Sequence, residues 1–319
     1  MVNVGIVGAG LAGGLHARNL TGFRDVSIRA VCDPDVERAR DLAGGCGALA
    51  CRSVDDLLDA APLDAVYVCV PPFAHGEPER AVLARRLPMY VEKPLAADGA
   101  TAREIASQVA GAGVLTQVGF QWRYRAFVPE ARELLAARPA RLVLAHWLSD
   151  APPAAWWRDE RLSGGPVVEQ AVHLLDLARW LAGEVEEVHA AGVRLPLPDG
   201  SGELLAASSA LLRFASGAVG TASTTCVLDR HARAELRVLA DGLALHLTAR
   251  SMTVERGEET VRREDAGSAM ERADRCFVDA VAGGPPDLRS PYHDALRSHE
   301  LALAIAGSAR TGRPVSPSG

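Results

Sequence analysis

The chain has 319 residues, of which 48% are hydrophobic and 23% charged, and its net charge is −6, so two domains with ample cores are expected. It contains no basic block and no apolar run of the roughly 18 residues that a membrane span needs, which argues against nucleic acid and membranes as partners. The N-terminus lacks the basic stretch of a signal peptide and the six cysteines form no Cys-x-x-Cys pair, so we expect a cytoplasmic protein with reduced thiols and no metal site.

The beginning of the chain has the pattern of a dinucleotide-binding unit. A strand is predicted over residues 2–7, a helix over 12–20 and a second strand over 26–32, ending at Asp33. Between the first strand and the helix lies a G-x-G-x-x-G motif made of Gly8, Gly10 and Gly13. Such glycines let the backbone approach a pyrophosphate, and the helix N-terminus stabilises its charge. Strand, turn, helix, strand and acid occur in order, which favours a nucleotide site over a chance glycine-rich turn.

Asp33 indicates which nucleotide is bound. A carboxylate after the second strand can accept hydrogen bonds from the adenosine ribose hydroxyls, whereas it would repel the 2′-phosphate of NADP. Arg38, on the following helix, could soften this preference. The sequence therefore predicts NAD as the cofactor, with NADP as the less favoured alternative.

The alternation of strands and helices continues to about residue 120. We predict strands over 64–70, 89–92 and 115–118 and helices over 75–87 and 101–109. This pattern predicts a Rossmann domain over residues 1–120, with an open parallel sheet that binds its ligand outside the carboxyl ends of the strands.

Lys93 lies at this edge of the predicted sheet, directly after the strand over 89–92. It is the only lysine among the 34 lysine and arginine residues of the chain. Arginine stays protonated, whereas a desolvated lysine can change its pKa and pass a proton. The position favours a catalytic role over the alternative that one lysine survived by chance in an arginine-rich composition.

The second half of the chain, residues 121–319, predicts an α+β domain. A helix over 129–137 precedes a set of strands, and a long helix over 292–311 ends the pattern. The strands suggest a large, mostly antiparallel sheet and are predicted over 141–147, 204–214, 218–226, 234–240, 243–248 and 252–255.

An apolar helix predicted over 167–182 carries a polar stripe. Glu169, His173, Asp176 and Trp180 follow one another at spacings of four, three and four residues, which places them on one helical face. Buried charges are costly unless they face a cavity or a partner. The stripe therefore predicts the wall of a site with His173 as proton carrier, although a purely structural His–Asp pair is the alternative.

Polar and aromatic side chains suited to a sugar follow the first domain. All five tryptophans lie between residues 122 and 180, and an indole packs well on the C–H face of a sugar ring. The candidate contacts with substrate or nicotinamide are Gln121, Arg123, Tyr124, Trp157 and Arg158. His75 follows a strand end, where it either contacts a ligand or begins a helix.

Motifs over nearly the whole chain resemble the Gfo/Idh/MocA family of nicotinamide-dependent sugar and cyclitol oxidoreductases. They are "GIVGAGLAG", "VCDPD", "VPPFAH", "EKPLA", "VGFQWRY", "SGGPVVEQAVHLLDLARWLAG" and "SPYHDALRSHELALAIAGSARTGRPV". The resemblance implies that Lys93 reaches the reacting oxygen and that His173 is the general base. Glu169 would orient His173, at a position where relatives commonly have aspartate, and Asp176 would bind a substrate hydroxyl. It also implies that the last helix packs on the first domain and that the sheet of the second forms dimer or tetramer contacts.

These observations predict hydride transfer between NAD and a secondary alcohol or ketone of a sugar, cyclitol or sugar derivative, including nucleotide sugars and aminoglycosides. An NAD-dependent glycosidase and a non-enzymatic NAD-sensing regulator of the same fold are the alternatives. The candidate cofactor contacts are Gly8, Gly10, Leu11, Ala12, Gly13, Asp33, Pro71, His75, Glu92, Lys93, Trp157 and Arg158. The candidate substrate contacts are Lys93, Gln121, Arg123, Tyr124, Trp157, Glu169, His173 and Asp176.

Overall fold

The structure is a computed structural model that describes residues 1–197, 200 and 202–317. The chain divides into two compact units. Unit 1 consists of Met1–Ala96, Ala100–Tyr124 and Ser268–Leu296, and unit 2 of Ala97–Gly99, Arg125–Gly267 and Arg297–Gly319. The predicted boundary after residue 120 stays a prediction. The sequence pattern did not indicate that unit 1 also takes in a segment from late in the chain.

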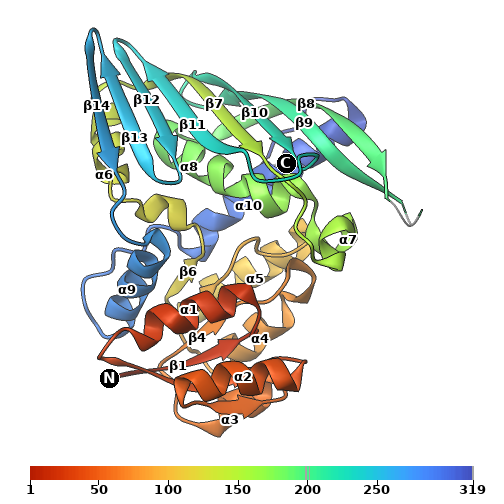
Figure 1. Ribbon diagram of the computed structural model, residues 1–319, viewed down its shortest axis with the longest axis vertical. Coiled ribbons are helices and arrows are strands. Elements are labelled where there is room, and N and C mark those ends of the chain that lie inside the picture. Colours follow the sequence, from red (N-terminus) through yellow and green to blue (C-terminus); the bar gives the residue numbers. More distant parts are fainter. Residues whose placement is uncertain (198–199, 201, 318–319) are drawn as a thin grey trace. The chain divides into compact units, whose positions relative to one another are not determined.

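Six parallel strands form the sheet of unit 1, in the order β3-β2-β1-β4-β5-β6 (Figure 1). Their bounds are β1 Val2–Val7, β2 Val26–Cys32, β3 Leu49–Cys51, β4 Ala65–Val68, β5 Met89–Val91 and β6 Thr116–Val118. The central strands are buried at almost every position, as expected of a parallel sheet that is covered on both faces. The strand order reverses between β1 and β4, so a ligand site is expected outside the carboxyl ends of these two strands.

Local signals explain most of the helices of unit 1. The side chain of Asp35 accepts hydrogen bonds from the backbone at the start of α2, and Gly47 ends that helix in the left-handed region. The helix predicted from residue 75 begins only at Glu77, because Gly76 has a φ of +105° and interrupts the helical backbone. The helical elements are α1 Leu11–Thr21, α2 Val36–Cys46, α3 Val54–Ala60, η1 Pro72–Ala74, α4 Glu77–Ala84, α5 Gly99–Ala112, η2 Gln121–Tyr124 and α9 Ala269–Val281.

Unit 2 contains the predicted large sheet, with eight strands in the order β14-β13-β12-β11-β7-β10-β9-β8. Neighbouring strands are antiparallel except β7 and β10, which pair in parallel. The strands are β7 Ala140–Leu148, β8 Val185–Pro196, β9 Glu203–Phe214, β10 Val219–Thr225, β11 Arg233–Ala240, β12 Leu243–Thr248, β13 Ser251–Arg256 and β14 Glu259–Glu264. The fold class is thus confirmed, and β8 and β14 are strands that the sequence analysis did not identify.

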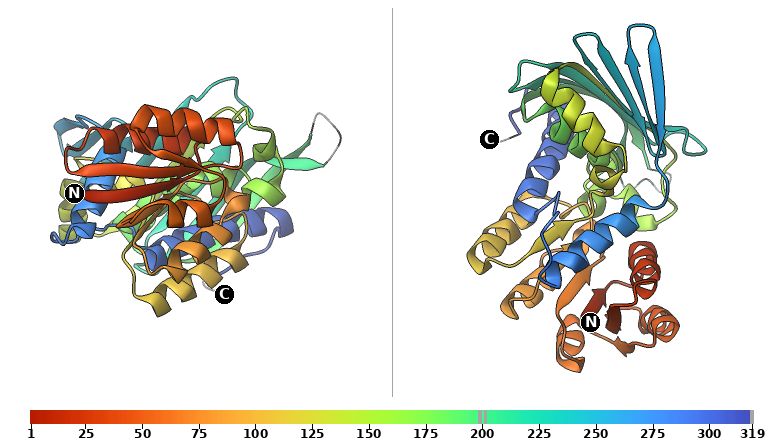
Figure 2. Two further views of the ribbon diagram at one scale, coloured as in Figure 1. Left: turned by 90° about the horizontal axis from the view of Figure 1, so that it is seen from below. Right: turned by 90° about the vertical axis from the view of Figure 1, so that its left-hand side faces the viewer.

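Helices of unit 2 lie against one face of this sheet, as α6 and α8 show in both figures (Figures 1 and 2). Along β9 the even-numbered residues from Leu204 to Phe214 are buried and most of the odd-numbered ones are more exposed, so the opposite face is open. The helices are α6 Val128–Ala137, η3 Ala155–Arg158, α7 Glu160–Ser163, η4 Val167–Ala171, α8 Val172–Ala182 and α10 Tyr292–Thr311. The first residues of α10, up to Leu296, belong to unit 1.

The two edges of the eight-stranded sheet differ. At β8, the backbone of Val188 exchanges two hydrogen bonds with Val315, so the end of the described chain covers part of this edge. At the other edge, β14 is largely exposed, and Arg263 binds Glu130 of α6 through its guanidinium group. Both arrangements restrict the access of another strand to the sheet edge.

No helix in the described part of the chain is long and apolar enough to cross a bilayer. Among the same residues there is also no group of three or more His, Cys, Asp or Glu side chains that could hold a metal ion.

Candidate active site

The glycine-rich loop has the geometry that a pyrophosphate site needs. Gly8 has a φ of +97°, and a Cβ atom there would lie 2.3 Å from the carbonyl oxygen of Cys69. A Cβ on Gly13 would lie 2.0 Å from the carbonyl oxygen of Gly8, whereas one on Gly10 would meet nothing within 4 Å. Gly8 and Gly13 are therefore required by close backbone packing, and Gly10 leaves open space beside the loop.

The first turn of α1, which follows Gly10, has no side-chain cap. Gly10 is its N-cap residue and provides no side-chain cap, and the first turn contains no acidic residue. The predicted contact residues Leu11 and Ala12 form this first turn. Unpaired backbone N–H groups and the helix dipole make such a turn suitable for a phosphate group.

Asp33, the predicted ribose contact, holds the glycine-rich loop through its side chain. Its Oδ2 accepts a hydrogen bond of 2.8 Å from the backbone of Ala9, and its Oδ1 accepts one of 2.9 Å from the backbone of Asp35. A carboxylate oxygen can accept more than one hydrogen bond. Asp33 can therefore hold the glycine-rich loop in place and still accept hydrogen bonds from a ribose.

The segment after β4 contains a buried imidazole–carboxylate pair. Pro71 precedes the turn η1, and the side chain of His75, which follows it, binds Glu79 with 2.5 Å between Nδ1 and Oε1. Glu79 also accepts a 2.6 Å hydrogen bond from the backbone of Gly76, and both side chains of the pair are fully buried. The Nε2 atom of His75 is buried and has no hydrogen-bond partner among the described residues. An orphaned polar atom beside the β4 end fits a position completed by a ligand.

Lys93 follows β5 and is half-buried, and the peptide bond between Lys93 and Pro94 is cis. Its backbone N–H donates a 3.1 Å hydrogen bond to Oε2 of Glu92, the predicted cofactor contact that precedes it. The other oxygen of Glu92 lies 3.2 Å from Nε2 of His16, a residue of α1. In this structure the carboxylate of Glu92 thus binds protein groups on both of its oxygens.

His16 is the centre of a buried cluster that the sequence analysis did not identify. Its Nδ1 lies 2.6 Å from Oδ1 of Asp274 on α9, and the other oxygen of Asp274 accepts a 2.7 Å hydrogen bond from Asn19. Burial by itself lowers the pKa of His16, but the charge and hydrogen bond of Asp274, together with Glu92, raise it to about 9. His16 is therefore an imidazolium ion between two carboxylates at neutral pH. The sequence separation of 258 residues between His16 and Asp274 leaves no local pattern that could reveal the pair.

Two predicted substrate contacts near residue 121 have structural partners inside unit 1. The guanidinium group of Arg123 is fully buried and ion-paired with Asp294. The hydroxyl of Tyr124 donates to Gln117 at 2.7 Å and accepts from the backbone of Arg289 at 2.7 Å. We therefore leave Arg123 and Tyr124 out of the substrate contacts proposed below, and Gln121, which is half-buried, remains.

In unit 2, Glu169 is held by a tryptophan. The indole N–H of Trp157, which is fully buried, donates a 2.7 Å hydrogen bond to Oε2 of Glu169. Glu169 lies in the π-helical turn η4, and His173 follows in the first turn of α8, so the predicted continuous α-helix is wound differently where the stripe begins. Such π-turns are frequent at functional sites. Trp157 therefore reaches the proposed site through Glu169, and its neighbour Arg158 is exposed.

The imidazole of His173 stacks on Trp147 of β7, with 6.0 Å between ring centroids and 23° between ring planes. Its side chain is buried. This contact fixes the ring plane of His173 against the sheet, so a proton acceptor in this place has a defined orientation.

Asp176 is fully buried and belongs to a different network of unit 2. Its Oδ1 accepts a 2.7 Å hydrogen bond from Ser298 of α10, whose hydroxyl accepts one of 2.6 Å from Arg179. Arg179 in turn binds Glu184 through two hydrogen bonds. Asp176 thus connects α8 to α10, and we leave it out of the proposed substrate contacts.

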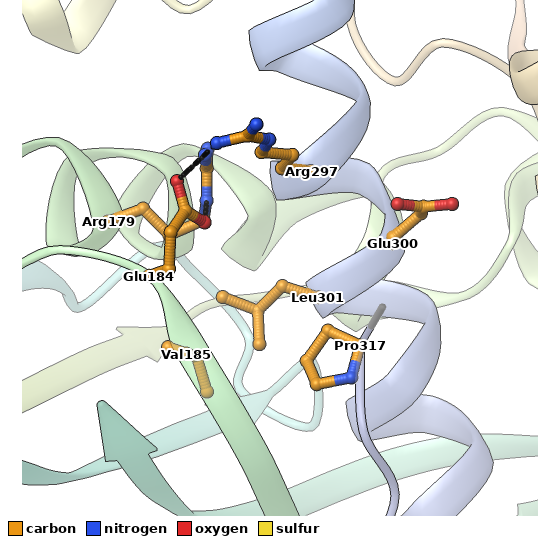
Figure 3. Close-up of a pocket in the computed structure, with 7 residues that line it drawn as sticks. All are labelled: Arg179, Glu184, Val185, Arg297, Glu300, Leu301 and Pro317. Carbon is orange, nitrogen blue, oxygen red and sulfur yellow. Dashed lines mark hydrogen bonds and ion pairs between the residues drawn. The ribbon is translucent and has the colours of Figure 1, made fainter. Parts of the chain in front are cut away.

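The same network ends at a surface pocket of about 270 Å³. Figure 3 shows a charged side, on which Arg297 and Arg179 both point at Glu184, and an apolar side with Leu301. The remaining lining residues are Val185, Glu300 and Pro317. Both arginines of the charged side already bind Glu184, and the pocket also carries the carboxylate of Glu300, so it does not define one ligand.

Together, a parallel sheet with this glycine-rich loop at its switch point and a second unit built on an open sheet define a two-part dinucleotide-dependent protein. Known families agree with this description. The profile described as "Oxidoreductase family, NAD-binding Rossmann fold" matches residues 2–120, and that of the "GFO/IDH/MocA C-terminal domain" matches residues 139–244. The chain therefore belongs to the Gfo/Idh/MocA family.

Individual relatives carry related names. Inositol 2-dehydrogenase 4 of Saccharopolyspora erythraea is 35% identical over 61% of this chain and 57% of the relative, and the rhizopine catabolism protein MocA of Rhizobium meliloti is 32% identical over 57% of each. The matched part of the chain thus spans little more than half the length of these curated relatives. Among solved structures, levoglucosan dehydrogenase with NADH and levoglucosan superposes with a TM-score of 0.89 at 21% identity over 100% of both chains. GenD2 from gentamicin A biosynthesis, in complex with NAD, superposes with a TM-score of 0.85 at 25% identity over 99% of this chain and 96% of that one.

Replacing Asp33 by Ala should weaken NAD binding and narrow the difference between the dissociation constants of NAD and NADP. The substitution removes the charge that opposes a 2′-phosphate and the acceptor that holds Ala9. Asp33→Asn keeps one oxygen acceptor and should narrow the same difference with less loss of NAD affinity. Asp55→Ala, which removes an exposed carboxylate in the first turn of α3, is the control. An unchanged ratio of the two constants in Asp33→Ala would show that Asp33 does not read the ribose.

The buried His16 should make stability depend on pH. Its pKa of about 9 in the folded protein lies above the ordinary value of 6.5, so its contribution is complete below pH 6.5 and is lost as the pH rises through 9. The free energy of unfolding should fall by roughly 3 kcal/mol over this range because of His16. Chemical denaturation of the wild type and of His16→Gln at several pH values gives the difference. Equal pH dependences of the two proteins would contradict the assignment.

Proposed function

We propose that the protein is an oxidoreductase that transfers a hydride between NAD and a secondary alcohol or ketone of a sugar, cyclitol or sugar derivative, with nucleotide sugars and aminoglycosides included. The observation that carries the proposal is that the chain's only lysine follows a strand at the carboxyl edge of a sheet whose loop suits a dinucleotide. The names of the relatives, inositol 2-dehydrogenase above all, support the class of substrate.

Different residues of unit 1 are proposed to bind different parts of NAD. The open space at Gly10 and the uncapped first turn of α1 receive the pyrophosphate, and Asp33 accepts hydrogen bonds from the ribose. His75, with Nδ1 fixed by Glu79, presents Nε2 to the ligand. When bound, the nicotinamide supplies the acceptor or donor of the hydride.

Two side chains are proposed to handle the charge and the proton. His173 takes the proton of the substrate hydroxyl, and Glu169, which Trp157 holds in place, orients it and stabilises its charged form. Lys93 donates a hydrogen bond to the reacting oxygen and stabilises the negative charge that develops there. Ketone reduction uses the same groups in reverse. Gln121 and Arg158 remain the candidate contacts for other parts of the substrate or cofactor.

We further propose a cytoplasmic protein that forms a homodimer or homotetramer through the open face of the sheet of unit 2. That face carries exposed apolar side chains on neighbouring strands, among them Val193, Leu211 and Val219. Exposed apolar side chains on an open sheet face are typical of association surfaces, and here they stand among charged ones such as Arg213. All six cysteines are free, in keeping with a reducing compartment.

The test is NADH formation across a panel of cyclitols, free sugars, nucleotide sugars and aminoglycosides, with analysis of products. A dehydrogenase forms ketone and NADH in equal amounts. A glycosidase of this fold cleaves its substrate without net NADH, and a regulator binds NAD without turnover. Either of these outcomes would replace the proposal by the corresponding alternative.

Replacing Lys93 by Arg should lower kcat by about 10²–10⁴-fold, because arginine keeps the charge but cannot take the same position or pass a proton. The dissociation constant of NAD should change little. Arg138→Lys, an exchange at an exposed position at the end of α6, should have no effect on turnover. Near wild-type kcat in Lys93→Arg would mean that the solitary lysine reflects composition alone.

Glu169 and His173 should act as one unit. His173→Ala and Glu169→Gln should each reduce kcat/KM, and their combination should cost much less than the product of the two losses. Glu169→Gln removes the charge that favours imidazolium, so the acid limb of kcat/KM should move to lower pH. Trp157→Phe, which removes the N–H bound to Glu169, should reproduce part of this shift.

If the loss of kcat/KM in the double variant equals the product of the losses in His173→Ala and Glu169→Gln, the two residues do not cooperate. A nearly silent His173→Ala together with a severe Asp176→Asn would identify a different base. Glu169→Asp, which restores the acid commonly found in relatives, is the conservative variant and should retain most activity.

A further inference from the structure

We propose that His16 and Asp274 are positioning residues for Lys93, acting through Glu92. This inference rests on the proposed function, in which Lys93 is the group that meets the reacting oxygen. It assigns a role to a buried cluster that the mechanism above does not use, and it is carried by the contacts of Glu92.

The side chain of Glu92 is restrained by contacts on several sides. One of its oxygens faces His16 and the other accepts the backbone N–H of Lys93, and only 12% of its side chain is exposed. On the remaining side lies Gly119, which follows β6. A Cβ atom on Gly119 would lie 2.2 Å from Oε1 of Glu92, so even one added methyl group would displace the carboxylate.

The side chain of His16, which contacts Glu92, is itself restrained by a hydrogen bond and by two aromatic rings. Asp274 binds its Nδ1 at 2.6 Å, and Asn19 in turn binds Asp274. The rings of Tyr67 and Tyr90 lie 5.1 and 4.8 Å from the imidazole centroid and are stacked on one another. The imidazole is therefore held by α1, β4, β5 and α9 together.

The cluster also sets the charge beside Lys93. One imidazolium ion and two carboxylates, those of Glu92 and Asp274, give a net charge of about −1 in a buried region. Burial raises the pKa of Tyr67, Tyr90 and Cys69 well above their ordinary values, so these groups stay neutral, and the nearby cation Arg275 is paired with Asp25 and Asp279. This negative charge lies one residue from Lys93, so it attracts the side-chain ammonium group, and removing the imidazolium should strengthen that attraction.

The rate at which Lys93 is acetylated can be measured without any enzymatic turnover. Acetylation with a soluble anhydride, followed by peptide mass spectrometry, reports the reactivity of Lys93 alone, since the chain has no other lysine. At pH 8 His16 is still mostly charged. His16→Gln should therefore leave two unbalanced carboxylates and slow acetylation about threefold. The double variant His16→Gln with Asp274→Asn restores the net charge and should restore the rate.

Displacement of Glu92 without a change of charge is the second arm. Gly119→Ala should lower kcat about tenfold while the NADH dissociation constant, measured by fluorescence, stays within about threefold of the wild type. Gly111→Ala on α5, where a Cβ meets nothing within 4 Å, is the matched control and should leave kcat unchanged. Melting temperatures identify any variant that fails to fold.

The two arms separate this inference from the proposed function. If the wild type binds NADH but turns over no substrate, the proposed function fails, and acetylation alone decides the role of His16 and Asp274. Equal acetylation rates in wild type, His16→Gln and the double variant would overturn the inference. So would a normal kcat in a folded Gly119→Ala that is active with a substrate of the panel.

Discussion

The imidazole of His16 lies between two carboxylates and joins parts of unit 1 that are far apart in the sequence. Removing three ionisable groups from water is costly unless each finds its partner, so the cluster of His16, Asp274 and Glu92 is stable only when all three are in place. It joins the helix that follows the glycine-rich loop to the strand that precedes Lys93, and it does so through α9, which enters from late in the chain. The phosphate-binding loop and the candidate catalytic lysine therefore share one support.

Unit 2 holds its candidate proton carrier by a comparable device. Trp157 binds Glu169 through an indole N–H, and Trp147 stacks on His173, so each of these two polar side chains has a tryptophan neighbour. A proton acceptor and a charge-stabilising donor are effective in proportion to how little they must reorganise during the reaction. In unit 2, His173 is thus held by Trp147, and in unit 1 the backbone of Lys93 is held by Glu92. Neither supporting residue needs to contact the substrate for this effect.

Local patterns predicted five of the six strands of unit 1 and missed the short strand β3 (Leu49–Cys51). The bounds of β1, β2 and β12 agree with the predicted ranges, because apolar runs between clear turn signals leave little choice. The cluster around His16 could not be predicted, since the pairing of residues 16 and 274 depends on tertiary packing. Arg123 and Asp176 are predicted ligand contacts, and the sequence pattern did not indicate that each also has a protein partner distant in sequence. The π-turn at Glu169 has no sequence signal of its own.

The edges of the eight-stranded sheet have a consequence for solubility. An open edge of this length would be a template on which further chains could add strands and grow into aggregates. Here the backbone of Val315 pairs with that of Val188 at the β8 edge, and the other edge is formed by β14, which is rich in arginine and glutamate. Strand addition at either edge is therefore hindered, and the open face, with Leu211 and Val219 beside Arg213, is the part of this sheet that is left for contact with a partner.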